Sequence, residues 1–523
     1  MKMKRLLAAA SAARTVAALA ISAGTLLMLS TQSAQAVPSY SRQFGVECTT
    51  CHTMWGALNG AGTTFKLSGY RAINGRDLKP VTPDIEISKG VSIPSTLPLS
   101  FITGVGIDSR SEKRDVGGGS VSSNGTSLAL MDASIFMTSQ LGKHLSAFVE
   151  FPMYETRAWE FTPTGNYEAR YNTAPGRNIK FGTESPTFEV AKFFWNNALG
   201  DSAPRDSVNL LAGITHLPLA YASGKVRLSV NQYLVYERTA LDLISPRKLN
   251  DGVFNGDAND NLFRLSEPQV MAEVYGMLTF GKPVADVAKS DTFWGEYHLG
   301  ITNGTNAKSA NRSQKDVYGR WVMRWYGQSL GVFAFRSGDI YGDDLRTTAS
   351  AGVNTPATGT GIMSGNQDAN KVSRWGPDFT LSLAPFGVPA VSLANQIMYN
   401  SESNPTGFGQ EFKWKGGFHQ LGWQISKTSA AYVRYDWLKG DSFNDTGSTV
   451  NGVTGITRST PKEHDWVLGW QHLYDQNIKL TAEFRHHIFD DTATGGLIPT
   501  LGVATNPARL TDNGFTLRVM FGF

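Results

Sequence analysis

The sequence predicts an all-β protein, a transmembrane antiparallel β-barrel of about 16 strands that follows a small helical N-terminal segment. Three observations lead to this fold class. The 523 residues include 54 glycines, 11% aromatic and 18% charged residues, a profile typical of β-structure. Apolar and polar residues alternate with a period of two over most of the chain. Long polar connections alternate with very short ones, as in outer-membrane barrels.

Residues 1–36 have the pattern of a secretory signal peptide. They carry four basic residues and no acidic one, an apolar run over residues 16–29, and the cleavage site Ala34-Gln35-Ala36. Without them the chain has 44 basic and 44 acidic residues, so its formal net charge falls from +4 to zero. This balance gives no reason to expect nucleic acid as a partner. A signal peptide followed by a β-barrel predicts that the protein is located in the outer membrane of a bacterium.

The only two cysteines of the chain lie in the motif Cys48-Thr49-Thr50-Cys51-His52. C-x-x-C-H is the attachment pattern of c-type haem, because each thiol can bond one vinyl group and the histidine can ligate the iron. A disulfide between the cysteines is the alternative in an oxidising compartment. A structural zinc would need four ligands, and no second Cys/His cluster lies nearby. We therefore predict one covalent haem c on Cys48 and Cys51, with His52 as proximal ligand.

The haem segment, residues 37–93, is too short to bury a haem as an independent domain. We expect a short helix over residues 49–58 that stops at Asn59-Gly60. Met54 is a candidate distal ligand, although it would have to reach the haem face opposite His52. A barrel residue, water or no ligand are the alternatives. Since the apolar band of a barrel is roughly 25 Å tall, a single haem can serve both sides only from within the lumen. We therefore expect this segment to plug the barrel.

Residues 94–523 are expected to form the barrel. Seventeen stretches have strand patterns, from residues 97–107 to residues 514–523, and an even number near 16 is usual for single-chain barrels. The stretch 319–325 is typical, since Trp321 and Trp325 alternate with Arg320 and Arg324. A soluble sandwich also alternates, but charges on strand after strand opposite an aromatic-rimmed face favour a lipid-exposed barrel with a wet lumen.

The connections predict which ends of the strands lie together. Residues 238–263 and 337–375 form long connections rich in Gly, Asn, Asp and Thr. Residues 327–328, 385–387 and 426–427 mark very short ones. Long loops on one side and tight turns on the other are characteristic of outer-membrane barrels.

Charged residues of the predicted lumen are further candidates for function. Four arginines could pair with haem propionates or could be solvated pore charges that tune ion selectivity: Arg320, Arg324, Arg434 and Arg485. Two loop clusters could hold ferrous iron or could only make turns: Asp251, Asp257 and Asp260, and Asp339, Asp343 and Asp344. On a strand, at most one of His486 and His487 can face the lumen.

With haem motif and barrel combined, the chain resembles the fused monohaem cytochrome–porins of the Cyc-two type. The resemblance rests on residues 44–70, namely Phe44-Gly45-Val46-Glu47-Cys48-Thr49-Thr50-Cys51-His52, then Leu58-Asn59, Gly62 and Phe65-Lys66-Leu67-Ser68-Gly69-Tyr70. The barrel matches by architecture only. Trp55-Gly56 departs from the family pattern, in which a proline is expected before Leu58-Asn59.

The resemblance implies an outer-membrane electron conduit. Its studied members act as Fe(II) oxidases, taking electrons from extracellular ferrous iron and passing them to a periplasmic cytochrome or another carrier. The family's haem ligands correspond to Cys48, Cys51 and His52. Similar fusions occur where iron is not the donor. Two other hypotheses remain: a diffusion porin with a structural or sensory haem segment, and an enzyme that acts on a small molecule at an open haem site.

Overall fold

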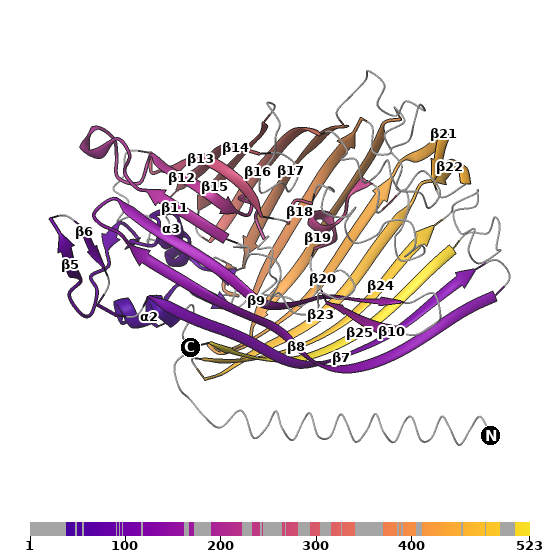
Figure 1. Ribbon diagram of the computed structural model, residues 1–523, viewed down its shortest axis with the longest axis horizontal. Helices are drawn as coiled ribbons and strands as arrows, with labels where there is room; N and C mark the ends of the chain where they lie inside the picture. The colour runs from indigo at the N-terminus through magenta and orange to yellow at the C-terminus, as the bar shows by residue number, and fades with distance from the viewer. Residues whose placement is uncertain are drawn as a thin grey trace.

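The computed structural model is a closed antiparallel β-barrel with sixteen strand positions (Figure 1). The structure describes residues 38–47, 50–54, 57–89, 91–93, 95–96, 98–116, 119–161, 167–171, 190–221, 233–240, 243, 264–266, 268–280, 293–303, 315–325, 327–339, 370–383, 386–388, 391–403, 410–450, 453–475, 477–491 and 508–522. The signal peptide, Cys48 and Trp55-Gly56 therefore lie outside the described residues.

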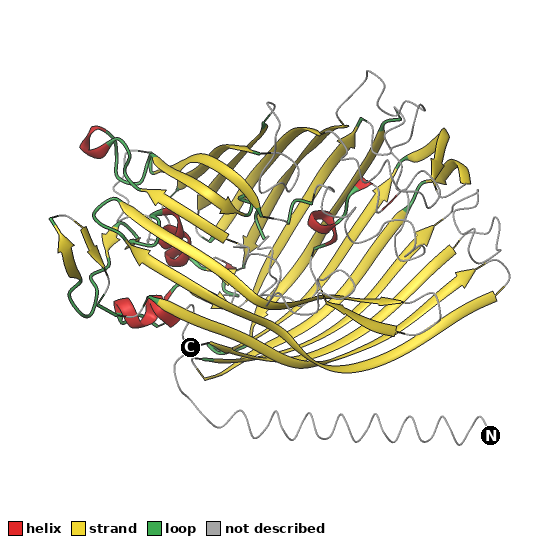
Figure 2. Ribbon diagram, viewed as in Figure 1, coloured by secondary structure: helices red, strands yellow, loops and turns green. Residues whose placement is uncertain are grey.

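Strands are by far the main secondary structure (Figure 2). The barrel strands are β7 (Leu99–Val116), β8 (Gly119–Gln140), β9 (Leu145–Phe161), β10 (Tyr167–Tyr171), β11 (Val190–Trp195), β12 (Asn209–Thr215), β13 (Gln269–Leu278), β14 (Trp294–Thr302), β15 (Asp316–Trp325), β16 (Gln328–Asp339), β17 (Asn370–Ser382), β18 (Val391–Glu402), β19 (Phe412–Gln424), β20 (Ser429–Gly440), β23 (Lys462–Asp475), β24 (Ile478–Asp491) and β25 (Ala508–Gly522).

These seventeen segments fill sixteen positions because β10 and β11 share one edge of β9. Tyr167 pairs with Phe161 near the end of β9, and Val190 pairs with Glu150 further back. The last strand, β25, closes the barrel on the first, β7, along a continuous register. The predicted count of about 16 is confirmed.

The two faces of each strand follow the predicted alternation. On β15, Trp321 and Trp325 are 37% and 51% exposed on the outside, whereas Arg320 between them is 6% exposed and faces the lumen. On β25, Phe515 and Leu517 are exposed while Thr516 is buried. An apolar outer band around a charged interior is the arrangement that lipid on one side and water on the other require. The chain is thus an outer-membrane barrel.

The two ends of the barrel differ in their connections. The short connections from β15 to β16, from β19 to β20 and from β23 to β24 share one end with the start of β7 and the end of β25. We call this end the periplasmic mouth, because short turns of such barrels face the periplasm. A hairpin of β21 (Ser442–Val450) and β22 (Val453–Ser459) extends one of the long connections at the other end (Figure 1). Among the described residues no helix is long and apolar enough to cross a membrane.

The remaining elements are short and lie mostly in the N-terminal segment. They are α2 (Pro38–Phe44), β1 (His52–Met54), β2 (Ala57–Leu58), α3 (Gly60–Leu67), β3 (Ala72–Ile73), β4 (Arg76–Asp77), β5 (Ile85–Ser88) and β6 (Val91–Ile93), with η2 (Gly200–Ser202) and α4 (Leu234–Glu237) between barrel strands.

The predicted helix over residues 49–58 is wrong. His52 instead pairs with Leu58 in the small hairpin of β1 and β2. Asn59 begins a helix and does not end one, since its side chain accepts a hydrogen bond from the Gly62 amide at 2.9 Å and donates to the Thr50 carbonyl at 3.0 Å. Asparagine is a good N-cap as well as a good turn residue, and the tertiary contacts decided between the two.

Candidate functional site

The N-terminal segment enters the periplasmic mouth and docks on the inner wall. Its first helix, α2, is held by Ser39, whose amide donates to the Ser100 hydroxyl at 2.8 Å and whose own hydroxyl lies 2.8 Å from that of Thr138. Ser100 and Thr138 are buried, lumen-facing residues of β7 and β8. Figure 1 shows α2 and α3 at the end of the barrel where the C-terminus lies. Helices α2 and α3 thus lie at the mouth, whereas all four residues of β5 are exposed. That the segment plugs the lumen stays a prediction.

The second contact lies at the end of α3. The Ser146 hydroxyl donates to the Gly69 carbonyl at 2.6 Å, and the Asn209 amide group donates to the Leu67 carbonyl at 3.3 Å. Buried carbonyls left free by the end of a helix are thereby satisfied by the barrel wall. Strands β9 and β12 consequently fix the position of α3.

Gly69 and Tyr70 both have left-handed backbone conformations, with φ of +64° and +63°. At Gly69 a Cβ atom would lie 2.3 Å from the Asn196 side-chain oxygen, so only glycine allows this close approach. The turn places the Tyr70 ring between Phe148 and Phe194 of the wall, each with a ring-centroid distance of 5.5 Å. The strained pair therefore positions an aromatic anchor.

Around the haem motif, the backbone is held by the start of α3. The Cys51 carbonyl accepts a hydrogen bond from the Asn59 amide at 2.9 Å. A Cβ atom on residue 62 would lie only 2.1 Å from this carbonyl oxygen, so the position requires glycine. Cys51 has a free, half-buried thiol, and burial raises its pKa to about 11. His52 is half-buried; for Met54 only the backbone, in β1, is described.

Four aromatic side chains next to the motif form an apolar cluster. Tyr40 contacts Phe65 and Tyr70 with ring-centroid distances of 5.1 Å, and Phe44 contacts Phe65 at 6.2 Å. Cys51 packs against the buried hydrophobic core to which Tyr40, Phe44 and Phe65 belong. Apolar rings beside a C-x-x-C-H thiol fit a porphyrin, whose faces and vinyl edge are hydrophobic. The residues present are compatible with haem c, which Cys48, Cys51 and His52 would hold.

The arginines singled out in the sequence all face the lumen, and each has a carboxylate partner on the wall. The ion pairs are Arg320–Asp378 at 2.9 Å, Arg324–Glu296 at 2.8 Å, Arg434–Asp436 at 2.6 Å and Arg485–Asp465 at 2.6 Å. Because each arginine is already paired, these side chains are better explained as charges of the lumen wall than as partners of haem propionates.

The two adjacent histidines point to opposite faces of β24, as predicted. His487 is 1% exposed and contacts Glu463 at 3.1 Å, whereas His486 contacts Asn513 at 2.6 Å. Of the six loop aspartates, only Asp339 lies in a described element, at the end of β16, and its side chain is not described. Within the described residues no group of three or more His, Cys, Asp or Glu side chains could hold a metal ion.

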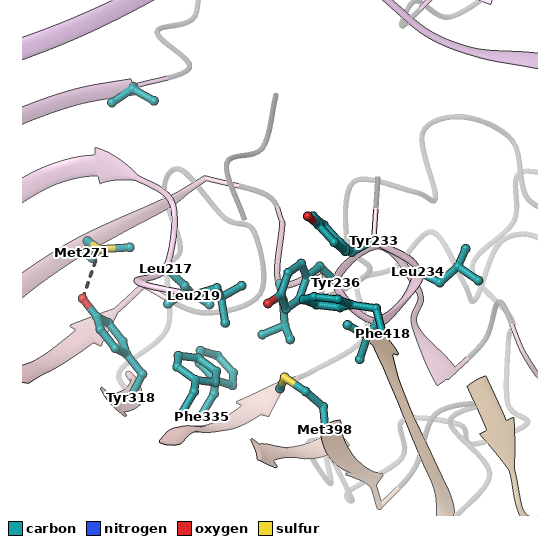
Figure 3. Close-up of a cluster of buried hydrophobic side chains, with 14 of the residues drawn as sticks. Leu217, Leu219, Tyr233, Leu234, Tyr236, Met271, Tyr318, Phe335, Met398 and Phe418 are labelled. Atoms are coloured by element: carbon teal, nitrogen blue, oxygen red, sulfur yellow. Dashed lines mark hydrogen bonds between the residues drawn. The ribbon is translucent and has the colours of Figure 1, made fainter. Parts of the chain in front are cut away.

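A second segment that was not predicted also folds into the lumen. Residues 233–240, which we call the lumen strap, include α4 and contact strands β18, β19, β20 and β23 of the wall. Figure 3 shows Tyr233 and Tyr236 of the strap beside Phe418. The Tyr233 hydroxyl donates to the Gln420 side chain at 3.0 Å, and Arg238 forms an ion pair with Glu463 at 2.6 Å. Tyr233 also packs on Phe418 with a ring-centroid distance of 4.2 Å. The aromatic pair Tyr233 and Tyr236 was the only signal available in the sequence.

The closed register, the apolar outer band and the segment in the periplasmic mouth define a porin-like outer-membrane barrel with an internal N-terminal segment. No protein-family model matches the sequence, and no curated protein matches it either.

Solved structures to which the chain is similar are outer-membrane proteins. The channel DcaP of Acinetobacter baumannii is 9% identical, with 84% of this chain and 100% of that chain covered and a TM-score of 0.42. The anion-selective porin of Comamonas acidovorans is 10% identical, with coverage of 81% and 99% and a TM-score of 0.42. OmpT of Vibrio cholerae is 10% identical, with coverage of 84% and 100% and a TM-score of 0.40.

Proposed function

We propose that this barrel is an outer-membrane electron conduit with one haem c in its periplasmic mouth. Cys48 and Cys51 attach the haem and His52 is its proximal ligand. An extracellular donor, with ferrous iron as the first candidate, would reach this haem through the lumen, and the electron would leave to a soluble periplasmic cytochrome or another carrier. The protein is then an Fe(II) oxidase in the sense that it removes one electron from each ion.

The observation that carries the proposal is the place of the C-x-x-C-H segment. It docks on lumen-facing residues of β7, β8, β9 and β12 through the contacts of Ser39, Leu67 and Gly69. A haem c supplies reversible one-electron chemistry at its iron. Inside a barrel mouth such a group is open to a periplasmic partner and shielded from lipid. The apolar cluster around Tyr40 and Phe65 supplies a hydrophobic seat.

The test is a redox experiment on the full-length protein in lipid vesicles. With a soluble cytochrome trapped on the periplasmic side, ferrous iron added to the opposite side should produce the absorption bands of the reduced haem and then reduce the trapped cytochrome. The double variant Cys48→Ser/Cys51→Ser should transfer no electrons. Haem that is reduced by dithionite but never by ferrous iron would exclude iron as the donor. A mature protein without covalent haem would exclude the conduit altogether.

A diffusion porin is the second candidate, favoured by the charged and wet lumen wall. The strap then acts as a constriction, because Tyr233 and Arg238 cross to the wall and narrow the passage. Planar-bilayer conductance separates the two functions. A large, stable open current from the intact protein supports the porin, and a current that appears only after removal of the N-terminal segment supports the conduit.

A further inference from the structure

Two lysines face the lumen beside the N-terminal segment. Lys192 of β11 is 8% exposed, and its ammonium nitrogen lies 5.1 Å, 5.4 Å and 5.7 Å from the ring centroids of Phe148, Phe194 and Tyr70. Lys66 belongs to α3 and is exposed. It lies within electrostatic range of Lys192 and of the wall carboxylates Glu273 and Glu296. The wall lysine and the segment lysine thus share one part of the lumen.

Neither lysine has an ion-pair or hydrogen-bond partner among the described residues, in contrast to the four lumen arginines. The nearest carboxylate on β13 is already engaged, since Glu273 accepts from the Tyr318 hydroxyl at 2.7 Å and contacts His298 at 2.9 Å. Glu150 also lies within electrostatic range of Lys192. A buried ammonium that contacts only aromatic faces is costly unless an anion reaches it.

The charged form of Lys66 is also disfavoured by its surroundings. The Lys66 side chain is exposed, but the surrounding wall partly desolvates its ammonium group. This desolvation lowers the pKa of Lys66, and repulsion from Lys192 lowers it further. An anion between the two amines would relieve both effects. Ammonium groups bind carboxylates through short, charge-assisted hydrogen bonds.

We infer that Lys66 and Lys192 form a binding site for a carboxylate, and that this carboxylate is a propionate of the haem. The inference rests on the proposed function. A haem c is attached through its vinyl edge, and its propionates are on the opposite edge of the ring. Cys51 contacts the start of α3 at Gly62, while Lys66 lies one turn further along the same helix. The site therefore lies one turn of α3 beyond the contact with Cys51, next to the aromatic anchor Tyr70.

The test compares Lys192→Met and Lys66→Met with the wild-type holoprotein by spectroelectrochemical titration. Removal of a positive charge beside a propionate should stabilise the oxidised haem, so the midpoint potential should fall. We expect about a tenfold change in the reduction equilibrium for Lys192→Met, which is about 59 mV for one electron. The propionate bending band in the resonance Raman spectrum should shift as well. Lys192→Arg, which keeps the charge, should restore most of both signals.

The control is Lys427→Met, which removes the same charge from an exposed turn between β19 and β20 at the same mouth. It should change neither the potential nor the Raman band. If Lys192→Met does not fold, Lys66→Met still decides, because the Lys66 side chain is exposed and does not belong to the barrel wall.

Three outcomes separate the alternatives. Covalent haem with an unchanged potential and an unchanged propionate band in both variants would overturn the inference and leave the proposed function standing. Binding of succinate to the wild-type holoprotein that is lost in Lys192→Met would show a site open to free carboxylates, which overturns the propionate assignment. Absence of covalent haem from the wild type would overturn the proposed function itself.

Discussion

The N-terminal segment and the lumen strap both fold into the barrel, but different forces hold them. The segment is fixed by neutral hydrogen bonds to its backbone, such as Ser146 to Gly69, and by aromatic packing of Tyr70. The strap is fixed by the packing of Tyr233 on Phe418 and by its hydrogen bond to Gln420, and in addition by the ion pair of Arg238 with Glu463. Neutral contacts are insensitive to salt, whereas a partly exposed ion pair is screened by it. We therefore expect salt to loosen the Arg238 end of the strap more than the docking turn of the N-terminal segment.

The largest expected effect concerns the haem seat. The double variant Cys48→Ser/Cys51→Ser should abolish covalent haem, because both thioether bonds are lost, while the barrel should still form, because its strands do not depend on the motif. Haem-linked peroxidase staining and heat-modifiable gel migration measure the two properties. The neighbouring variant Thr50→Ser should keep its haem. Covalent haem in the double variant would contradict the attachment.

The next effect concerns the strap. Arg238→Met leaves Glu463, which is 1% exposed, without its guanidinium partner. Because the Arg238 side chain is itself 22% exposed, we expect a loss of about 2 kcal/mol, below the range for fully buried pairs. The strap should then leave the wall, and single-channel conductance should rise in a protein that lacks the N-terminal segment. Arg509→Met, which breaks an exposed pair with Asp490, should change nothing. Equal conductance in both variants would show that the strap does not narrow the lumen.

A smaller effect concerns the docking turn. Gly69→Ala places a Cβ against Asn196 and forces alanine into a left-handed conformation, which costs about 1–2 kcal/mol from the backbone alone. Limited proteolysis from the periplasmic side should cut the N-terminal segment faster. Gly387→Ala is the control, since it has φ of +81° but no atom within 4 Å. If the two variants are cut at the same rate, close packing at Gly69 does not hold the plug.

The smallest effect is a pH dependence of the haem-free protein. The pKa of the Cys51 thiol is raised by burial to about 11, from 9.0. Below pH 9 the thiol is neutral whether the segment is docked or released, so docking is unaffected. Between pH 9 and 11 the released segment loses this proton more readily, so docking weakens as the pH rises. Alkylation by iodoacetamide should therefore increase with a midpoint near pH 11, and a midpoint near 9 would show an exposed thiol.

Much of the barrel could be predicted because each strand carries its own pattern. Trp321 is apolar and Arg320 is charged, so in a bilayer the strand must turn Trp321 towards lipid and Arg320 towards the lumen. The helix predicted over residues 49–58 failed because Asn59 suits both a helix start and a turn, and only its bonds to Gly62 and Thr50 distinguish them.

The sequence by itself determined the barrel, its alternating faces, and the C-x-x-C-H attachment pattern, because these depend on residues close together in the chain. Only the tertiary structure brought Lys66 beside Lys192, Gly69 against Ser146, and Arg238 against Glu463. Such pairs are 77 or more residues apart in the chain, and period-two alternation says nothing about which lumen residues meet across the interior. Closure of the barrel determines which residues of the inner wall become neighbours, because it places every strand beside partners that its own sequence does not specify.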